Sequence, residues 1–135
     1  MVVQEFGIMY EKQKQAIRVL IVDDHAILRM GLTTFLESVD DMVVVGEAAN
    51  GQEALDLIQI AHPDVVIMDL AMPVMDGMTA TAIISQQYPF AHVIVLTSSY
   101  SDEREKEALK AGAVGYLRKN IPTAVLAKAI REAVH

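Results

Sequence analysis

The sequence predicts an α/β protein with a parallel β-sheet that is covered by helices on both faces. From Arg18 onward, runs of β-branched residues alternate with segments of helical period, which is typical of βαβ units. The strand-like runs are almost wholly apolar, as expected for strands that are buried on both faces. Acidic, hydroxyl and basic residues directly follow these runs, where the loops of a doubly wound sheet carry its chemistry.

Five strands and five helices are expected in alternation. The strands are expected at residues 19–22, 43–46, 65–68, 93–96 and 115–117. Apolar stripes mark the first and last helices: Leu28, Gly31, Leu32 and Phe35 in the first, and Leu126, Ile130 and Ala133 in the last. This pattern predicts an internal sheet within a single domain.

Helix boundaries are marked by capping residues and prolines. Asn50 followed by Glu53 predicts an N-cap with its reciprocal glutamate. Pro63 and Pro89 are expected to end the second and third helices, and Pro122 suits the first turn of the fifth.

The fourth helix differs from the others because residues 101–107 are all polar. Only Ala108, Leu109 and Ala111 remain to anchor it, so it is expected to be loosely held. Two interpretations stay open. It is either a solvated helix rich in Glu/Lys pairs or a mobile element reserved for switching.

Composition excludes several classes of protein. With 11 Lys+Arg against 18 Asp+Glu, the net charge of −7 argues against DNA binding by this segment, because nucleic-acid affinity depends on clustered cations. The longest apolar runs, such as residues 65–68, are far shorter than the roughly 20 residues of a membrane helix. The absence of Cys suits a reducing compartment, so a cytoplasmic location is expected.

Two regions are expected along the 135 residues. Residues 1–16 lack the basic start and continuous apolar stretch of a secretory signal, and we interpret them as an N-terminal extension of unassigned role. Residues 17–135 form the domain itself.

Chemically active side chains follow four of the five strands. Asp23 and Asp24 follow the first strand, Asp69 the third, Thr97 the fourth and Lys119 the fifth. Because the carboxyl ends of parallel strands converge, these groups should meet at one edge of the sheet. An Asp after a strand often caps the next helix, and Asp24 suits that role. Asp69 does not suit a capping role, because it begins a long loop and lies far from the next helix.

Three neighbouring carboxylates repel one another, and Lys119 offsets only one of their charges. The two negative charges that remain favour the binding of a dication, and a small set of hard oxygen ligands suits Mg²⁺. Asp23, Asp24, Asp69 and the backbone carbonyl of Ala71 are the expected metal ligands.

Beside a metal and an ammonium, a carboxylate can attack the phosphorus of a phosphodonor and form an acyl phosphate. Asp69 is the expected nucleophile and phosphoacceptor. Lys119 and the Thr97 hydroxyl are expected to bind phosphoryl oxygens.

Four motifs, VLIVDDH, DVVIMDLAMPVMDG, LTSS and GAVGYLRK, resemble those of the receiver domain of two-component response regulators. The resemblance covers residues 18–134. His25 and the run 28–32 look most like NarL/LuxR-type transcription regulators. For His25 itself, a helix-start residue without chemistry is favoured over a pH-sensitive or kinase-facing role. The resemblance implies a flavodoxin-like (CheY-like) sheet of order 2-1-3-4-5 and phosphorylation by a sensor histidine kinase.

The resemblance also implies a switch. Phosphorylation of Asp69 draws Thr97 toward the new oxygens, and Tyr116 turns inward to fill the space that Thr97 leaves. The alternative for Tyr116 is a half-exposed packing residue. Asn120 stands where many relatives have proline, which puts the family's cis peptide after Lys119 in doubt, because a cis bond before a non-proline residue costs roughly 3–4 kcal/mol.

The output of such a switch stays open. We expect either a fragment whose DNA-binding helix-turn-helix lies outside the chain, with possible homodimer formation on phosphorylation, or a stand-alone receiver that docks a partner protein. A receiver catalyses only its own phosphorylation and dephosphorylation. An Asp/Mg²⁺-dependent phosphatase is a rival, disfavoured because Asp23 and Asp24 are adjacent rather than two residues apart. An inert binding module is the third class.

Overall fold

The structure is a computed structural model that describes residues 16–135. The expected N-terminal extension therefore lies outside the described residues, apart from Ala16. Strands and helices alternate in the order β1 (Ile17–Val22), α2 (Ala26–Glu37), β2 (Met42–Ala48), α3 (Gly51–Ala61), β3 (Val65–Asp69), α4 (Gly77–Gln87), β4 (His92–Thr97), α5 (Asp102–Ala111), β5 (Gly115–Arg118) and α6 (Thr123–Val134). Each predicted strand lies inside an observed one.

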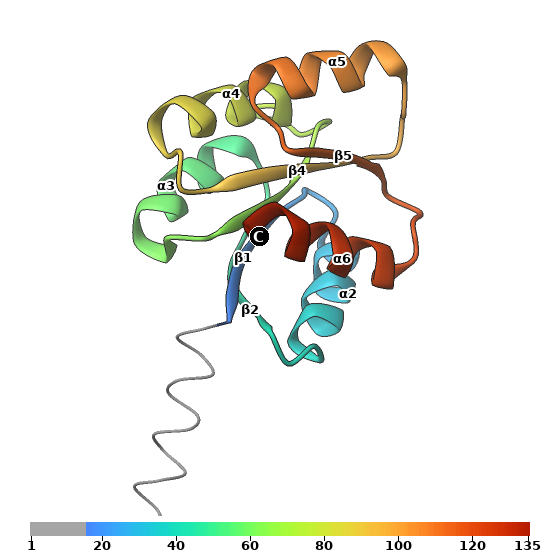
Figure 1. The fold of residues 1–135 in the computed structure, drawn as a ribbon. Coiled ribbons are helices and arrows are strands. Elements are labelled where there is room, and N and C mark those ends of the chain that lie inside the picture. Colours follow the sequence, from blue (N-terminus) through green and yellow to red (C-terminus); the bar gives the residue numbers. More distant parts are fainter. Residues whose placement is uncertain (1–15) are drawn as a thin grey trace, which may run out of the picture.

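The five strands form one parallel sheet in the order β2-β1-β3-β4-β5 (Figure 1). This is the predicted 2-1-3-4-5 order, so the flavodoxin-like fold is confirmed. In the register of the central strands, Val22 of β1 pairs with Met68 of β3, and Asp69 pairs with Leu96 of β4. The carboxyl ends of β1, β3 and β4 therefore finish at the same edge.

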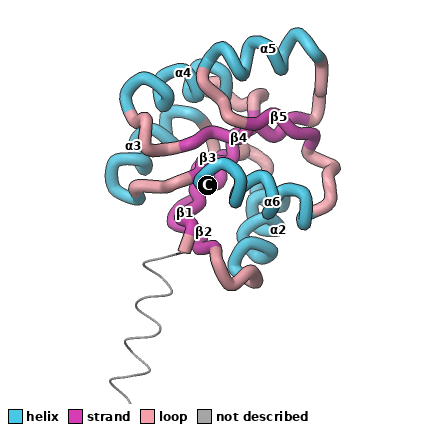
Figure 2. Tube along the Cα trace, in the orientation of Figure 1, coloured by secondary structure: helices cyan, strands magenta, loops and turns pink. Residues whose placement is uncertain are grey.

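The helices cover both faces of the sheet in two layers. Helices α3, α4 and α5 lie on one side and α2 and α6 on the other (Figures 1 and 2). Each layer encloses its own apolar core, one around Leu20, Met68 and Ile84, and the other around Ile21 and Ile130. All five residues are at most 1% exposed, and Leu20, Ile21 and Met68 belong to the apolar strand runs that predicted their burial.

Two strands are less buried than the sequence suggested. Residues 43–46 of β2 are only half-buried, and in β5 only Tyr116 is buried. The reason is the topology, since β2 and β5 are the edge strands, each with one neighbour. The expectation that every strand is covered on both faces is therefore wrong for β2 and β5.

Most predicted helix boundaries are confirmed. Asn50 caps α3 by accepting a hydrogen bond from the backbone N–H of Glu53 at 2.9 Å, and the Glu53 carboxylate accepts one from Ala49 N–H at 3.2 Å. Helices α3 and α4 end two residues before Pro63 and Pro89. The prediction for Pro122 is wrong by one position, because this residue is the extended N-cap of α6 rather than part of its first turn.

Helix α5 is anchored by fewer side chains than the sequence suggested. Its one buried residue is Ala108, while Leu109 is 49% exposed and so does not anchor the helix. Ser101 caps the amino end by accepting a hydrogen bond from Arg104 N–H at 3.1 Å. The small buried surface agrees with the expected weak anchorage, and how loosely the helix is held stays a prediction.

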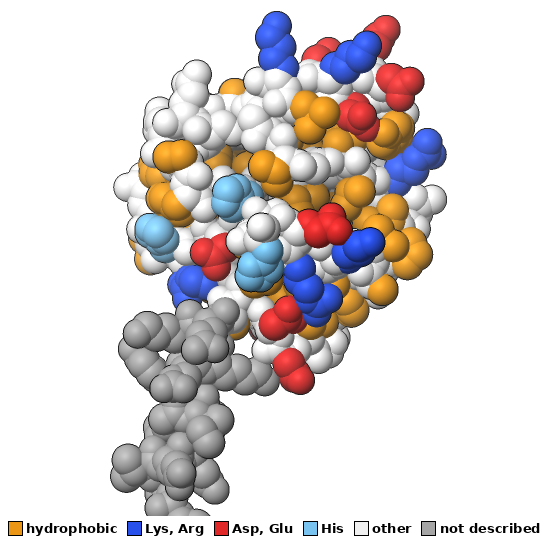
Figure 3. All heavy atoms as spheres, viewed as in Figure 1, with side chains coloured by type: hydrophobic (Ala, Val, Ile, Leu, Met, Phe, Trp, Pro, Cys, Tyr) orange, Lys and Arg blue, Asp and Glu red, His pale blue; other side chains and the backbone are white. Residues whose placement is uncertain are grey.

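No helix within residues 16–135 is long and apolar enough to cross a membrane. On the face drawn in Figure 3, acidic and basic side chains are interleaved over α5 and α6. That face carries no broad basic patch of the kind that binds nucleic-acid phosphates.

We expect the backbone amides of α5 to exchange with solvent at least about tenfold faster than those of α4 and α6. Helix α4 buries Ile84, and α6 buries Leu126 and Ile130, whereas α5 buries only Ala108. One large buried side chain is worth about 1.5–3 kcal/mol, and about 1.4 kcal/mol is tenfold in an opening equilibrium. Hydrogen–deuterium exchange followed by mass spectrometry measures this. Equal protection in the three helices would contradict it.

Candidate phosphoacceptor site

Strand pairing brings the acidic residues to one edge of the sheet. Asp23 follows directly after β1, and Asp69 is the last residue of β3. Because Val22 pairs with Met68 in the parallel register, the next residue of each strand lies side by side. Both carboxylates are buried, each residue being 3% exposed. The sheet thus holds two acids together with little water around them.

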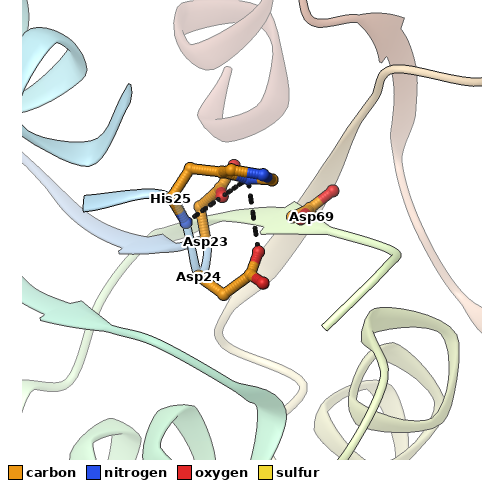
Figure 4. Close-up of side chains that lie close together, drawn as sticks. All are labelled: Asp23, Asp24, His25 and Asp69. Atoms are coloured by element: carbon orange, nitrogen blue, oxygen red, sulfur yellow. Dashed lines mark hydrogen bonds and ion pairs between the residues drawn. The ribbon is translucent and has the colours of Figure 1, made fainter. Parts of the chain in front are cut away.

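The cluster contains one residue more than the sequence predicted. Ligand atoms of Asp23, Asp24, His25 and Asp69 all lie within 4.8 Å of one another. In Figure 4 the first three come from the connection between β1 and α2, and Asp69 comes from the end of β3. The three expected carboxylates are together. Neither interpretation of His25, a helix-start residue or a pH-sensitive or kinase-facing one, placed it in this cluster, although its position directly after two acids was the available signal.

Lys119 joins the two buried carboxylates. Its Nζ lies 2.8 Å from Oδ2 of Asp23 and 3.1 Å from Oδ1 of Asp69. The backbone N–H of Lys119 donates to the carbonyl of Thr97 at 2.9 Å, which fixes the lysine against the end of β4. The predicted juxtaposition of the ammonium with the acids is therefore present in the structure.

The two buried acids have opposite pKa shifts. Burial and the negative charge of Asp23 raise the pKa of Asp69, although Lys119 acts against them. Burial also acts to raise the pKa of Asp23, but hydrogen bonds from Lys119 and His25 outweigh it and lower that pKa. Burial acts to lower the pKa of Lys119, yet its bonds to the two carboxylates raise it overall.

One oxygen of the cluster lacks a partner. Oδ2 of Asp69 is buried and accepts no hydrogen bond, although buried polar atoms are nearly always satisfied. A dication held by this oxygen and the neighbouring carboxylates would supply the missing interaction and offset the excess negative charge. The residues present therefore fit the Mg²⁺ that was expected from the sequence.

The loop after Asp69 is tightly folded against the end of β3. Gly77 opens α4, and its N–H donates to the carbonyl of Leu70 at 3.0 Å. A Cβ at position 77 would overlap the backbone carbonyl of Asp69, so only glycine fits. Val74 adopts a left-handed conformation with φ of 67°, which is strained for a β-branched residue. Ala71 is exposed in this loop, and its role as a metal ligand stays a prediction.

Thr97 and Tyr116 lie on adjacent strands. Thr97 is 5% exposed, and its hydroxyl oxygen accepts a hydrogen bond from the N–H of Ser99 at 3.1 Å. Tyr116 is only 7% exposed, and its hydroxyl has no hydrogen-bond partner. The alternative of a half-exposed packing tyrosine is therefore wrong, because the ring already lies inside. The ring of Tyr116 packs at a tilt against the ring of Tyr100, with the two ring centroids 5.0 Å apart.

Tyr100 was missed by the sequence analysis. Its hydroxyl contacts the carboxylate of Glu105 in α5, and the Arg118 guanidinium lies 4.7 Å from its ring centroid. Hydrogen bonding to Glu105 and burial raise the pKa of Tyr100. Nothing in local sequence spacing signals this cluster, because it depends on how the β4–α5 loop folds back over β5. No peptide bond in residues 16–135 is cis, the one between Lys119 and Asn120 included.

A comparison with protein families matches residues 19–131 to the response regulator receiver domain. The chain is 45% identical over 117 residues to the transcriptional regulatory protein LiaR of Bacillus subtilis (strain 168). The match covers 87% of this chain and 56% of LiaR. The chain thus spans about half the length of the curated relatives it matches.

Solved structures give the same result. The chain resembles a LuxR-family two-component response regulator from Aurantimonas sp. SI85-9A1 with a TM-score of 0.83 and 35% identity, over 88% of this chain and 85% of that one. It also resembles the receiver domain of the response regulator NarL from Mycobacterium tuberculosis, with a TM-score of 0.78 and 33% identity, over 85% and 97% of the two chains. The expected likeness to NarL/LuxR-type regulators is confirmed.

Gly77→Ala is expected to destabilise the protein by about 1–3 kcal/mol, because the added methyl group forces the Asp69 backbone to move. Gly31→Ala is the matched control. Nothing lies within 4 Å of a Cβ at position 31 in helix α2, so this change should stabilise by about 0.5–1 kcal/mol. Urea unfolding measures both. A neutral Gly77→Ala variant would contradict the close approach.

Asp69→Asn is expected to stabilise the metal-free protein at neutral pH. Because the folded-state pKa of Asp69 is raised, the wild type is most stable relative to the variant below the unfolded pKa of about 3.9. The wild type loses this stability relative to the variant as the pH rises through the pKa of Asp69 in the folded state. Urea unfolding from pH 4 to 8 measures the gap, which should widen toward neutral pH.

Asp56→Asn provides the control for this pH series, because Asp56 is exposed on α3 and accepts a single hydrogen bond, from Gln52. Its stability difference should stay within about 0.5 kcal/mol across the range. A gap for Asp69→Asn that widens toward acid pH instead would show that ionised Asp69 stabilises the fold.

Proposed function

Because this chain belongs to the response regulator receiver domain family, we propose that it is a phosphorylation-dependent signalling switch whose phosphoacceptor is Asp69. The observation that carries this proposal is the orphaned Oδ2 of Asp69, buried beside two further acids and Lys119. An attacking oxygen must be unprotonated and unblocked. Oδ2 carries no hydrogen bond that would have to be broken before attack.

In the proposed reaction an oxygen of the Asp69 carboxylate forms a bond to the phosphorus of a phosphodonor. The bond between phosphorus and the donor's leaving group breaks, and the leaving group keeps the electron pair. The product is an acyl phosphate. Water later attacks this phosphorus and returns the free carboxylate and inorganic phosphate. The chain therefore acts only on its own phosphorylation and dephosphorylation.

Asp23, Asp24 and Asp69, with the Ala71 carbonyl, are the proposed ligands of Mg²⁺. When bound, the dication neutralises charge on the transferring phosphoryl oxygens. Lys119 already lies 3.1 Å from Oδ1 of Asp69, so it can pair with a phosphoryl oxygen after a small movement. The proposed role of Lys119 is to stabilise the negative charge of the phosphoryl group on Asp69, which the neighbouring carboxylates would repel.

Thr97 and Tyr116 are the proposed switch residues. A phosphoryl group on Asp69 adds acceptor oxygens, and the Thr97 hydroxyl is available to donate to one of them, because the bond it makes in the structure is as an acceptor. Tyr116 is buried here, so the phosphorylated state is proposed to favour this inward position rather than to create it.

The biological context is proposed from the family and its relatives. A sensor histidine kinase would be the phosphodonor, and this chain would act in the cytoplasm. Residues 17–135 would form the receiver, with residues 1–16 as an extension of it. Control of a DNA-binding output domain outside this chain suits LiaR, a transcriptional regulatory protein of which the match covers 56%. Homodimer formation on phosphorylation is proposed as part of that output. Docking of a separate partner protein is the alternative output.

We expect acetyl phosphate with Mg²⁺ to add one phosphoryl group, and beryllofluoride with Mg²⁺ to saturate one site. Asp69→Asn should abolish both, because the amide cannot form the acyl phosphate. Asp56→Asn, on the exposed face of α3, is the matched control and should label as the wild type does. Intact-mass spectrometry and titration measure the two reactions.

Labelling that persists in Asp69→Asn would contradict the assignment. Sustained turnover of a generic phosphomonoester, lost in Asp24→Asn, would instead indicate the phosphatase class. The absence of both labelling and Mg²⁺ binding would indicate a binding module that retains the fold without its chemistry.

A further inference from the structure

We propose that His25 supplies a nitrogen ligand to the cation site, so that this receiver binds transition dications such as Ni²⁺, Co²⁺ and Zn²⁺ more tightly than its oxygen ligands alone would allow. The inference rests on the proposed function in one respect, that Asp23, Asp24 and Asp69 hold a cation. It adds a fourth side chain and a second class of ion to that site.

The imidazole of His25 lies close to two of the carboxylates. Nδ1 of His25 lies 2.9 Å from Oδ1 of Asp23 and 3.3 Å from Oδ1 of Asp24 (Figure 4). Adjacent ligands of an octahedral ion with bonds of about 2.1 Å lie about 3.0 Å apart. The imidazole nitrogen is therefore already at the spacing of an adjacent ligand from two of the carboxylates.

The His25 ring has no capping role in helix α2. His25 occupies the N-cap of α2, yet its side chain makes no capping hydrogen bond. Its backbone N–H, rather than its ring, makes the local turn by donating to Oδ1 of Asp23 at 2.8 Å. The side chain is 66% exposed, so the ring can shift by a fraction of an ångström without disturbing a packed core. Its position among the acids is not required by the helix.

Asp69 indicates a cation independently of His25. Its Oδ2 is buried without a partner, although buried polar atoms are nearly always satisfied. One oxygen of the same carboxylate lies within 4.8 Å of ligand atoms from Asp23, Asp24 and His25. A cation bound by the Asp69 carboxylate would therefore have the His25 imidazole close by.

Ion chemistry then separates two classes of metal. Imidazole suits Ni²⁺, Co²⁺ and Zn²⁺, whereas Mg²⁺ is a hard ion that prefers carboxylate, carbonyl and water oxygens. His25 should therefore add affinity for the first class and little for Mg²⁺. These ions would compete with Mg²⁺ at the phosphoacceptor.

The competing explanation is that His25 only orients Asp23 through the hydrogen bond from Nδ1. In that case removing the ring would weaken every cation alike, because Asp23 serves them all. An asparagine at position 25 can still donate a hydrogen bond, but its amide is a poor ligand for Ni²⁺. His25→Asn therefore separates a ligand from a hydrogen-bond donor.

The experiment is a calorimetric titration of the tag-free chain with Ni²⁺ and, separately, with Mg²⁺. The variants are His25→Ala and His25→Asn, with His62→Ala as the control, since His62 is exposed away from the cluster at the carboxyl end of α3. Broadening of the backbone NMR signals of residues 23–25 by paramagnetic Ni²⁺ locates the ion. We expect both His25 variants to lose Ni²⁺ affinity about tenfold or more, with Mg²⁺ affinity changed less than about threefold.

The inference is overturned by any of three results: unchanged Ni²⁺ affinity in His25→Ala, a parallel loss of Mg²⁺ and Ni²⁺ affinity, or recovery of Ni²⁺ affinity in His25→Asn. Loss of Ni²⁺ affinity in His62→Ala, without broadening at residues 23–25, overturns it as well. His25-dependent Ni²⁺ binding in a wild type that binds no Mg²⁺ would support the inference and contradict the proposed function.

Discussion

The site depends on one interaction, the ammonium of Lys119 placed between two buried carboxylates. Asp23 and Asp69 are each 3% exposed and are held side by side by the pairing of β1 with β3. Two such charges repel strongly where little water screens them. Lys119 contacts both carboxylates, at 2.8 and 3.1 Å, and so reduces their repulsion. Its single positive charge does not cancel the negative charge of the cluster. The remaining negative charge is what a dication would compensate.

The strand order explains why this cation is a lysine at the end of β5. Strand β4 lies between β3 and β5, so a side chain from β5 must extend across a strand to reach Asp69. Neighbouring strands are about 4.8 Å apart, so β5 and β3 are separated by about 9.6 Å. The long flexible stem of lysine covers most of that separation, and the Asp69 side chain covers the rest. The hydrogen bond from Lys119 N–H to the Thr97 carbonyl fixes the starting point of that stem. The fold and the site are thus linked through β4.

Sequence reasoning succeeded where a feature depends on period or on strand ends. The sheet order came from the family resemblance, and the meeting of the acids with Lys119 came from the convergence of parallel strand ends. It failed where the direction of a single side chain decides the outcome. Leu109 lies next to buried Ala108 in α5 but points outward, and Tyr100 folds back over β5 from a loop. No pattern of spacing encodes either direction, because both follow from packing between distant segments.

The buried polar groups that lack partners indicate how such a site could change state. Under the proposed function, Asp69 receives the phosphoryl group and Tyr116 is a switch residue that responds to it. Each of the two residues carries a buried side-chain oxygen without a hydrogen-bond partner. An unsatisfied buried group costs about 1–3 kcal/mol, so this arrangement is less stable than one in which partners are supplied. Strand β4 lies between them, since Asp69 pairs with Leu96 and Tyr116 pairs with Val95. Thr97 is the last residue of this strand, so a phosphoryl group that engages Thr97 would act on the strand that connects Asp69 to Tyr116.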